Sequence, residues 1–143
     1  MFKDAKATSA KGRSFVIIML VIAFLAVFLR FGIKKLIEVN ITQSESNAQV
    51  TLKLISTALE NYAKDNNGVY PESLSNLTKT HPPYLEKDYT SQTSLIRSYD
   101  YSCSRLTAVG YSCSATPSKC KLTGKKSYTI STSGILLSED CSK

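Results

Sequence analysis

The sequence predicts an α+β protein with a long N-terminal transmembrane helix that continues into a helix packed on a small antiparallel sheet, followed by a disulfide-stapled C-terminal region. Three observations predict this fold. An apolar run covers residues 14–33, and a stripe of apolar residues at helical period follows it. All four cysteines then lie in the last 41 residues, among short segments with the composition of strands.

The apolar run is about 20 residues long, which corresponds to about 30 Å of helix and matches the hydrocarbon core of a bilayer. Its only charge is Arg30, close enough to the end of the run to reach the interface. A cleaved secretory signal is the competing interpretation. The run is long for such a signal, however, and Arg30 and Phe31 follow where a small-residue cleavage site would be needed.

Most of the net charge of +7 lies beside the apolar run. Residues 1–35 carry +6, whereas residues 36–143 carry +1. Basic residues that flank a span set its topology, and the excess before the run favours a cytoplasmic N-terminus. The nearly neutral remainder argues against a broad nucleic-acid-binding face.

Beyond the apolar run, the spacing predicts that the helix continues to about residue 66, with a break near Gly32 as an open alternative. Gly68 follows where a left-handed residue would end the helix, and Tyr70 and Pro71 come next. The predicted packing face of the helix consists of residues spaced four and three apart: Ala48, Leu52, Ile55, Leu59 and Tyr62.

Four short segments rich in Tyr, Val, Ile, Ser and Thr predict strands at residues 99–104, 108–115, 127–131 and 135–138. An even number of cysteines in a small exported domain indicates two disulfides, although three pairings are possible and free thiols remain an alternative. Zinc fits the spacing poorly because there is no Cys-x-x-Cys pair. A hairpin between the first two strands favours Cys103 with Cys113, which leaves Cys120 for Cys141.

Residues with catalytic potential are sparse, and we expect no enzyme activity, no catalytic residues and no metal site. His81 is the only histidine and precedes two prolines in a predicted loop. One basic cluster, with Tyr111 and Tyr128 as candidate neighbours, could contact only a few phosphates, so nucleic acid is not an expected partner. That cluster is formed by Lys119, Lys121, Lys125 and Lys126.

Residues 54–71 resemble the helix-to-loop junction of bacterial type IV pilins and type II secretion pseudopilins. The shared elements are Ala-Leu-Glu-x-Tyr at residues 58–62, Asp-Asn-Asn-Gly at 65–68 and Tyr-Pro at 70–71. Residues 82–85 are similar to the loop that follows in that family, and residues 123–135 are similar to the last hairpin of its minor members. The resemblance implies the pilin-like version of the fold predicted above.

The resemblance also implies leader cleavage by a prepilin peptidase between Gly12 and Arg13. Ile17 stands where the family usually has a glutamate that pairs with the N-terminal amine of a neighbouring subunit. Arg13 would be the first residue after the cut, where the family usually has a phenylalanine. Together, these departures imply an atypical, minor or tip-located subunit, or else an uncut chain that stays anchored in the membrane. The expected divisions are a basic leader at 1–12, a transmembrane half-helix at 13–33, an outer half-helix at 34–67, a connecting loop region at 68–98, and the sheet with its disulfide-bonded region at 99–143.

By this resemblance the chain is expected to be a structural subunit of a pilus or pseudopilus. Its partners would be other pilin-like subunits bound through the N-terminal helix, the prepilin peptidase, and an assembly platform with its ATPase. Its expected location is the bacterial inner membrane, crossed once, with the C-terminal domain periplasmic or extracellular. No cofactor is expected. Some pseudopilins bind calcium, but adjacent Glu139 and Asp140 do not define a site.

Overall fold

The computed structural model describes the backbone of residues 9–91 and 98–142, and the side chains of residues 14–91 and 98–142. Its first element is helix α1, Ser9–Asp65, which is continuous through Gly32. The chain divides into two compact units, Met1–Glu38 and Val39–Lys143. Within the described residues, the first unit is helix alone, so the folded core belongs to the second unit.

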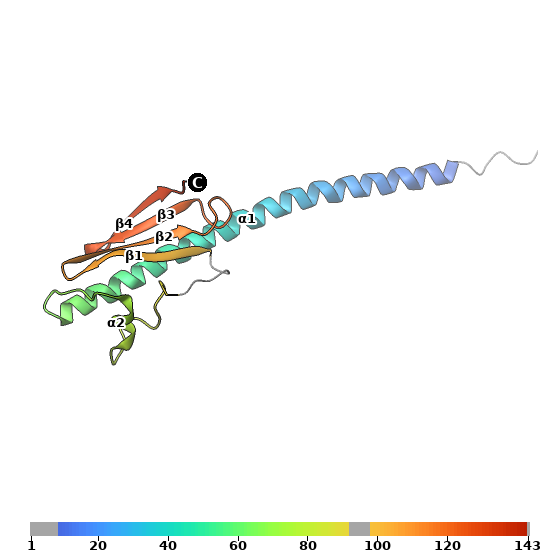
Figure 1. The fold of residues 1–143 in the computed structure, drawn as a ribbon. Coiled ribbons are helices and arrows are strands. Elements are labelled where there is room, and N and C mark those ends of the chain that lie inside the picture. Colours follow the sequence, from blue (N-terminus) through green and yellow to red (C-terminus); the bar gives the residue numbers. More distant parts are fainter. Residues whose placement is uncertain (1–8, 92–97, 143) are drawn as a thin grey trace, which may run out of the picture. The chain divides into compact units, whose positions relative to one another are not determined.

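The second unit combines the later part of α1 with a short helix and a four-stranded antiparallel sheet in the order β1-β2-β3-β4 (Figure 1). Consecutive strands are neighbours throughout, as in a simple meander. This confirms the α+β class and the small antiparallel sheet. The elements after α1 are α2 (Leu74–Lys79), β1 (Tyr99–Thr107), β2 (Gly110–Pro117), β3 (Lys126–Ser131), the 3₁₀ turn η1 (Thr132–Gly134) and β4 (Ile135–Asp140).

Two short connections set the register of the sheet. β1 and β2 pair up to Thr107 opposite Gly110, which leaves a two-residue turn at Ala108 and Val109. β3 and β4 are joined through η1, where Ser133 and Gly134 have φ of 70° and 74°. Residues with positive φ allow the tight reversal between neighbouring antiparallel strands.

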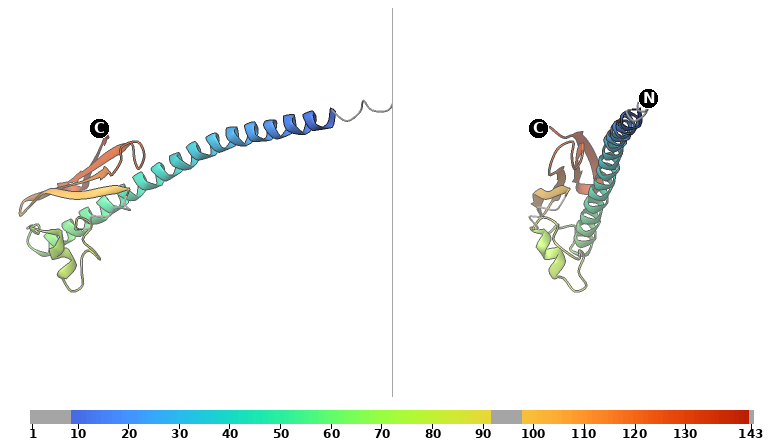
Figure 2. Two further views of the ribbon diagram at one scale, coloured as in Figure 1. Left: turned by 45° about the vertical axis from the view of Figure 1, so that its right-hand side comes forward. Right: turned by 90° about the vertical axis from the view of Figure 1, so that its right-hand side faces the viewer.

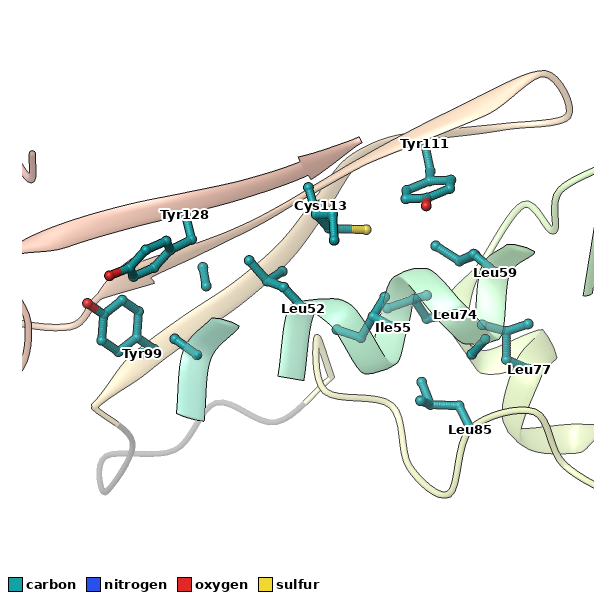
Figure 3. Close-up of a cluster of buried hydrophobic side chains, with 14 residues drawn as sticks. Leu52, Ile55, Leu59, Leu74, Leu77, Leu85, Tyr99, Tyr111, Cys113 and Tyr128 are labelled. Carbon is teal, nitrogen blue, oxygen red and sulfur yellow. The ribbon is translucent and has the colours of Figure 1, made fainter. Parts of the chain in front are cut away.

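One face of the sheet packs on α1, and the core lies between them (Figure 3). Tyr111, Cys113 and Tyr128 point from the sheet toward Leu52 and the helix residues near it (Figure 3). Side chains alternate between the two faces of a strand, so buried residues recur at every second position of β2 and β3. Burial of each large aliphatic side chain in this layer stabilises the fold by about 1.5–3 kcal/mol.

α1 ends at Asp65, one residue before the end expected from the sequence. Asn67 and Gly68 adopt left-handed φ values of 58° and 84°. This conformation lets the Gly68 amide donate back to the Ala63 carbonyl at 2.7 Å, which satisfies one of the last orphan carbonyls of the helix. The Asn66 side chain donates to the Tyr62 carbonyl at 2.8 Å.

The connecting region at residues 68–98 contains one regular element that the sequence pattern did not indicate, the short helix α2. Ser73 caps this helix, and its hydroxyl accepts from the Ser75 amide. Leu74 and Leu77 are buried and hold it in the core. Six residues are too few to form a stable helix alone, so tertiary burial explains α2 better than local propensity does. In the left view of Figure 2, the sheet lies above the later part of α1 and α2 lies below it.

Candidate functional site

The first part of α1 presents a continuous exposed apolar surface. Every described side chain from residue 14 to residue 40 is exposed. A contiguous apolar surface of this extent is unusual for a soluble monomer and marks a site that contacts lipid or another protein. Its large hydrophobic members are Phe15, Val16, Ile17, Ile18, Met19, Leu20, Val21, Ile22, Phe24, Leu25, Val27, Phe28, Leu29, Phe31, Ile33, Leu36, Ile37 and Val39.

The segment Ser14–Asp65 is long and apolar enough to cross a membrane. Its most apolar window has a mean hydropathy of 2.8, and none of that window is buried within the chain. This length and composition fit either a membrane span or a signal sequence. In either case, the surface is suited to an apolar environment.

The expected leader-cleavage site and the position of the missing family glutamate lie near the start of α1. Ile17 is 60% exposed and extends the apolar surface at the position where the family has a carboxylate. The backbone of Gly12 and Arg13 is helical, but their side chains lie outside the described residues. Residues 1–8 of the expected leader also lie outside the described part of the chain.

The later part of α1 uses one side for the core. Ala48, Leu52, Ile55 and Leu59 are buried and Tyr62 is half-buried, so the packing face expected from the sequence is the face that meets the sheet. Tyr62 also packs edge-on against Tyr84, with ring centroids 5.6 Å apart. The pattern missed further buried residues of the helix, namely Ile41, Ser56, Ala58 and Ala63.

Glu60 is the main polar link between α1 and the rest of the second unit. Its Oε1 accepts from the Tyr111 hydroxyl and from the Ser133 amide, and its Oε2 accepts from the Tyr70 hydroxyl, each at 2.9 Å. The Tyr111 hydroxyl also lies 2.7 Å from the buried Ser56 Oγ. One carboxylate therefore joins the helix to β2, to η1 and to the loop that follows the helix.

The tyrosines around Glu60 are kept protonated. Burial raises the pKa of Tyr111 to about 12; the hydrogen bond to Ser56 opposes this shift, and the hydrogen bond to Glu60 adds to it. Burial, together with the same carboxylate, also raises the pKa of Tyr70. Both phenols thus remain donors at neutral pH, as a structural link to a carboxylate requires.

A second glutamate, Glu45, holds the other end of β3. Its Oε1 accepts from the Lys125 amide at 2.7 Å, just before the strand begins. Beside it, the Tyr99 hydroxyl donates to the Lys126 carbonyl at 2.7 Å, and burial raises the pKa of Tyr99 far above its usual value. Glu45 and Glu60 thus fix the two ends of β3 to one helix.

The structure forms both disulfides in the pairing that the sequence favoured. Cys103 and Cys113 face each other across β1 and β2, with Cα atoms 3.9 Å apart. The second bond joins Cys120 to Cys141, which ties the residue after β4 to the loop between β2 and β3. All four cysteines are therefore structural.

His81 lies in an exposed loop and forms a cis peptide bond with Pro82. It lines a surface cleft of about 550 Å³ together with Tyr62, Asp65 and Tyr84, among others. The Tyr84 hydroxyl donates to Asp65 at 2.6 Å, which occupies one oxygen of the only carboxylate among the residues that line this cleft.

Glu139 and Asp140 are exposed on β4, the last strand of the sheet. Because consecutive strand residues point to opposite faces, the two carboxylates do not converge on one point. Among the described residues, no cluster of three or more His, Cys, Asp or Glu side chains could hold a metal ion.

The basic cluster does lie together around the loop between β2 and β3, and its four lysines are exposed. The expectation that Tyr111 and Tyr128 accompany it was wrong. Both rings are at most 4% exposed because they point into the core (Figure 3), where they cannot stack on a base. The lysines are thus a charged loop without an aromatic platform from these residues.

The outer face of the sheet carries an array of hydroxyl groups that the sequence interpretation missed. The signal was the alternation Ser-Cys-Ser, found twice, and Ser-Tyr-Thr-Ile-Ser. Ser102 and Ser114 face each other on this side, with their Oγ atoms 3.0 Å apart. The array consists of Ser102, Ser112, Ser114, Thr116, Ser127, Thr129 and Ser131.

Comparisons of the chain with family models, with curated proteins and with solved structures give no match. The resemblance of residues 54–71 to the pilin junction therefore stays an expectation from the sequence.

Proposed function

We propose that the chain is a pilin-like structural subunit of minor abundance, which assembles through its N-terminal apolar helix into a type II secretion pseudopilus or a type IV pilus. One observation carries this proposal. A single helix, α1, exposes apolar side chains over residues 14–39 and packs its later part against a disulfide-bonded antiparallel sheet.

The physical case begins with the exposed part of α1. Its apolar side chains are unfavourable in water, so this part needs lipid before assembly and the apolar helices of other subunits afterwards. A helix that is apolar on all sides can move from lipid to a bundle of apolar helices at a modest cost in free energy. The second unit, in contrast, has a complete core of its own and does not depend on the exchange.

Ile17 supports a minor or terminal position. A charge within an apolar helix bundle is costly unless it is paired, so a repeating subunit needs a carboxylate to meet the neighbouring N-terminal amine. Ile17 supplies only an apolar side chain. A subunit of this kind fits one end of a filament, where no neighbour requires that carboxylate.

The remaining features of the proposal follow from topology and from the family resemblance. The chain crosses the bacterial inner membrane once with its N-terminus in the cytoplasm, and the second unit is periplasmic or extracellular, where both disulfides are stable. Prepilin peptidase would cut after Gly12, and an assembly platform with its ATPase would extract the subunit. The proposed role is structural and not enzymatic.

The alternative proposal is an unprocessed, single-pass membrane anchor that uses the same fold as a binding module and does not polymerise. Arg13 favours it, because a charged residue stands where the family has an apolar first residue after the cut. The basic residues on both sides of the apolar run also suit a permanent span.

Intact mass after co-expression with a prepilin peptidase tests processing. We expect the loss of residues 1–12 from the natural chain and from a Gly32→Leu control, and no loss from Gly12→Leu. An uncut natural chain would reject processing and favour the anchor.

A photo-crosslinking amino acid at Ile22 tests assembly in the host cell. We expect crosslinks to other pilin-like subunits, together with recovery of the protein in sheared filament or pseudopilus material. The same probe at Val109, 88% exposed at the turn between β1 and β2, is the positional control. Protein found only in the inner membrane, without crosslinks from position 22, would reject the structural-subunit proposal.

A further inference from the structure

A charged loop with an apolar tip lies between β2 and β3. Residues 118–126 contain four lysines and no acidic residue. Within them, Leu122 is 60% exposed and is flanked by Lys121 on one side and, beyond the turn, by Lys125 on the other. We refer to residues 118–126 as the lysine loop. An exposed leucine among lysines is the pattern of a surface that enters the headgroup region of a membrane.

The lysine loop is held in a defined shape. The Leu122 and Thr123 amides both donate to the Lys119 carbonyl, at 3.1 and 2.9 Å, and the Lys121 amide donates to the Gly124 carbonyl at 2.7 Å. Cys120 is bonded to Cys141, and Gly124 is buried against Tyr99. Because the loop is already ordered, little conformational entropy is lost when its tip meets a surface.

A contact with α1 tethers the lysine loop near the proposed span. The Lys125 amide is bound to Glu45 of α1. Glu45 follows Ile33, the last residue of the proposed span, by 12 residues. Twelve residues cannot exceed about 43 Å even when fully extended. This limit holds whatever the arrangement of the two units, so the loop is tethered within reach of the bilayer that α1 would cross.

Four carboxylates lie near the lysine loop and offset part of its charge. Glu45 accepts from the Lys125 amide, and Asp100 accepts from the Ser118 hydroxyl. Asp140 and Glu139 lie opposite Lys126 and Ser127 on the neighbouring strand. Lys119, Lys121 and Lys125 stand outside this pairing and are exposed. We therefore propose that the lysine loop binds the anionic headgroups of the bilayer surface, with Leu122 inserted among them, and so docks the second unit on the membrane before assembly.

This inference rests on the membrane span of the proposed function but not on polymerisation. The lysines of the loop would attract it to the anionic headgroups, since each basic residue near an anionic surface raises the population of the membrane-bound state by about fivefold. Screening over a Debye length of about 10 Å makes the attraction sensitive to salt. A docked second unit would also shield the lysines from soluble partners until the subunit is extracted.

The chain contains no tryptophan, so Leu122→Trp introduces a single fluorescent reporter at the tip. The full chain with this change is reconstituted in vesicles of phosphatidylcholine, with or without phosphatidylglycerol. In anionic vesicles we expect a blue-shifted indole emission and quenching by brominated lipid. Both effects should be lost in neutral vesicles, in high salt, and after Lys119→Gln, Lys121→Gln and Lys125→Gln are combined.

The matched control combines Lys53→Gln, Lys64→Gln and Lys79→Gln, three exposed lysines outside the lysine loop, and should leave the signal unchanged. An indole equally exposed to water in both kinds of vesicle would overturn the proposal. An equal blue shift with duplex DNA in neutral vesicles would assign the loop to nucleic acid and overturn it too. Flotation of the same samples tests the span separately, because a chain that does not float rejects the span itself.

Discussion

The Tyr111 hydroxyl donates to Glu60 Oε1 at 2.9 Å, and this bond joins two residues that are 51 positions apart in the chain. The same oxygen accepts from the Ser133 amide, and the other oxygen accepts from Tyr70. Three donors from three separate segments therefore converge on one carboxylate of α1. The association of the helix with the sheet depends on this residue as well as on apolar packing.

Glu60→Gln should destabilise the second unit by about 1–3 kcal/mol, because the amide nitrogen would replace one acceptor oxygen and face a donor. All eight tyrosines lie between residues 62 and 128, so tyrosine near-UV circular dichroism of the full chain in detergent reports on this unit alone. Denaturant unfolding followed by this signal gives the change in free energy. Glu72→Gln, at an exposed position, is the control; equal stability of the two variants would contradict a special role for Glu60.

Glu45→Ala should lower the free energy of unfolding by less than Glu60→Gln does, by about 0.5–1.5 kcal/mol, because it removes a single hydrogen bond at an exposed site. Glu45→Gln keeps a carbonyl oxygen for the Lys125 amide and should retain most of the stability. Glu45 and Glu60 are 15 residues apart on the helix, about 22 Å, so their effects should add within about 0.5 kcal/mol. A strongly non-additive double variant would show that the two ends of β3 are coupled.

Gly124→Ala should destabilise the second unit by about 1–3 kcal/mol through overpacking. A Cβ at this buried position would overlap the Tyr99 hydroxyl and would lie only 2.6 Å from Tyr99 Cζ. Tyr99 cannot move aside without losing its bond to the Lys126 carbonyl. The matched control is Gly32→Ala, where a Cβ meets nothing within 4 Å; near-UV unfolding curves that coincide for the two variants would show that Tyr99 can yield.

Local pattern was sufficient for much of this fold. The period of Ala48, Leu52, Ile55 and Leu59 identified the face of α1 that packs on the sheet, since a helix in a small domain must bury its apolar stripe. Gly68 marked the end of the helix because its left-handed φ is accessible to few other residues. The hairpin geometry was also enough to favour the pairing of Cys103 with Cys113.

Features that depend on tertiary contacts were not predictable from the sequence. Helix α2 is too short for a periodic signal and is stabilised by the burial of Leu74 and Leu77. Glu60 stood in a recognisable motif, but its three donors come from residues 70, 111 and 133. The expectation that Tyr111 and Tyr128 lie with the surface lysines failed because strand alternation turns both rings inward.

The buried tyrosines predict a loss of stability at alkaline pH. The pKa of Tyr111 is about 12 in the folded chain, compared with an ordinary value of 10.0, and burial also raises the pKa of Tyr99, Tyr128 and Tyr70. Between pH 10 and about 12 the folded state therefore holds more protons than the unfolded state. Stability should be unaffected by these groups below pH 10 and should fall as the pH rises through that window.

Tyrosinate absorbance of the folded and denatured chain measures this difference directly, because denatured tyrosines should all ionise near pH 10. Tyr111→Phe should remove one of the late-ionising groups and flatten the fall in stability. It should also lower stability at neutral pH, because the Ser56 hydroxyl loses its acceptor and Glu60 loses one of its three donors. Tyr62→Phe is the control. If the natural chain and Tyr111→Phe lost stability equally between pH 10 and 12, the buried Glu60–Tyr111 link would not be the source of the alkaline sensitivity.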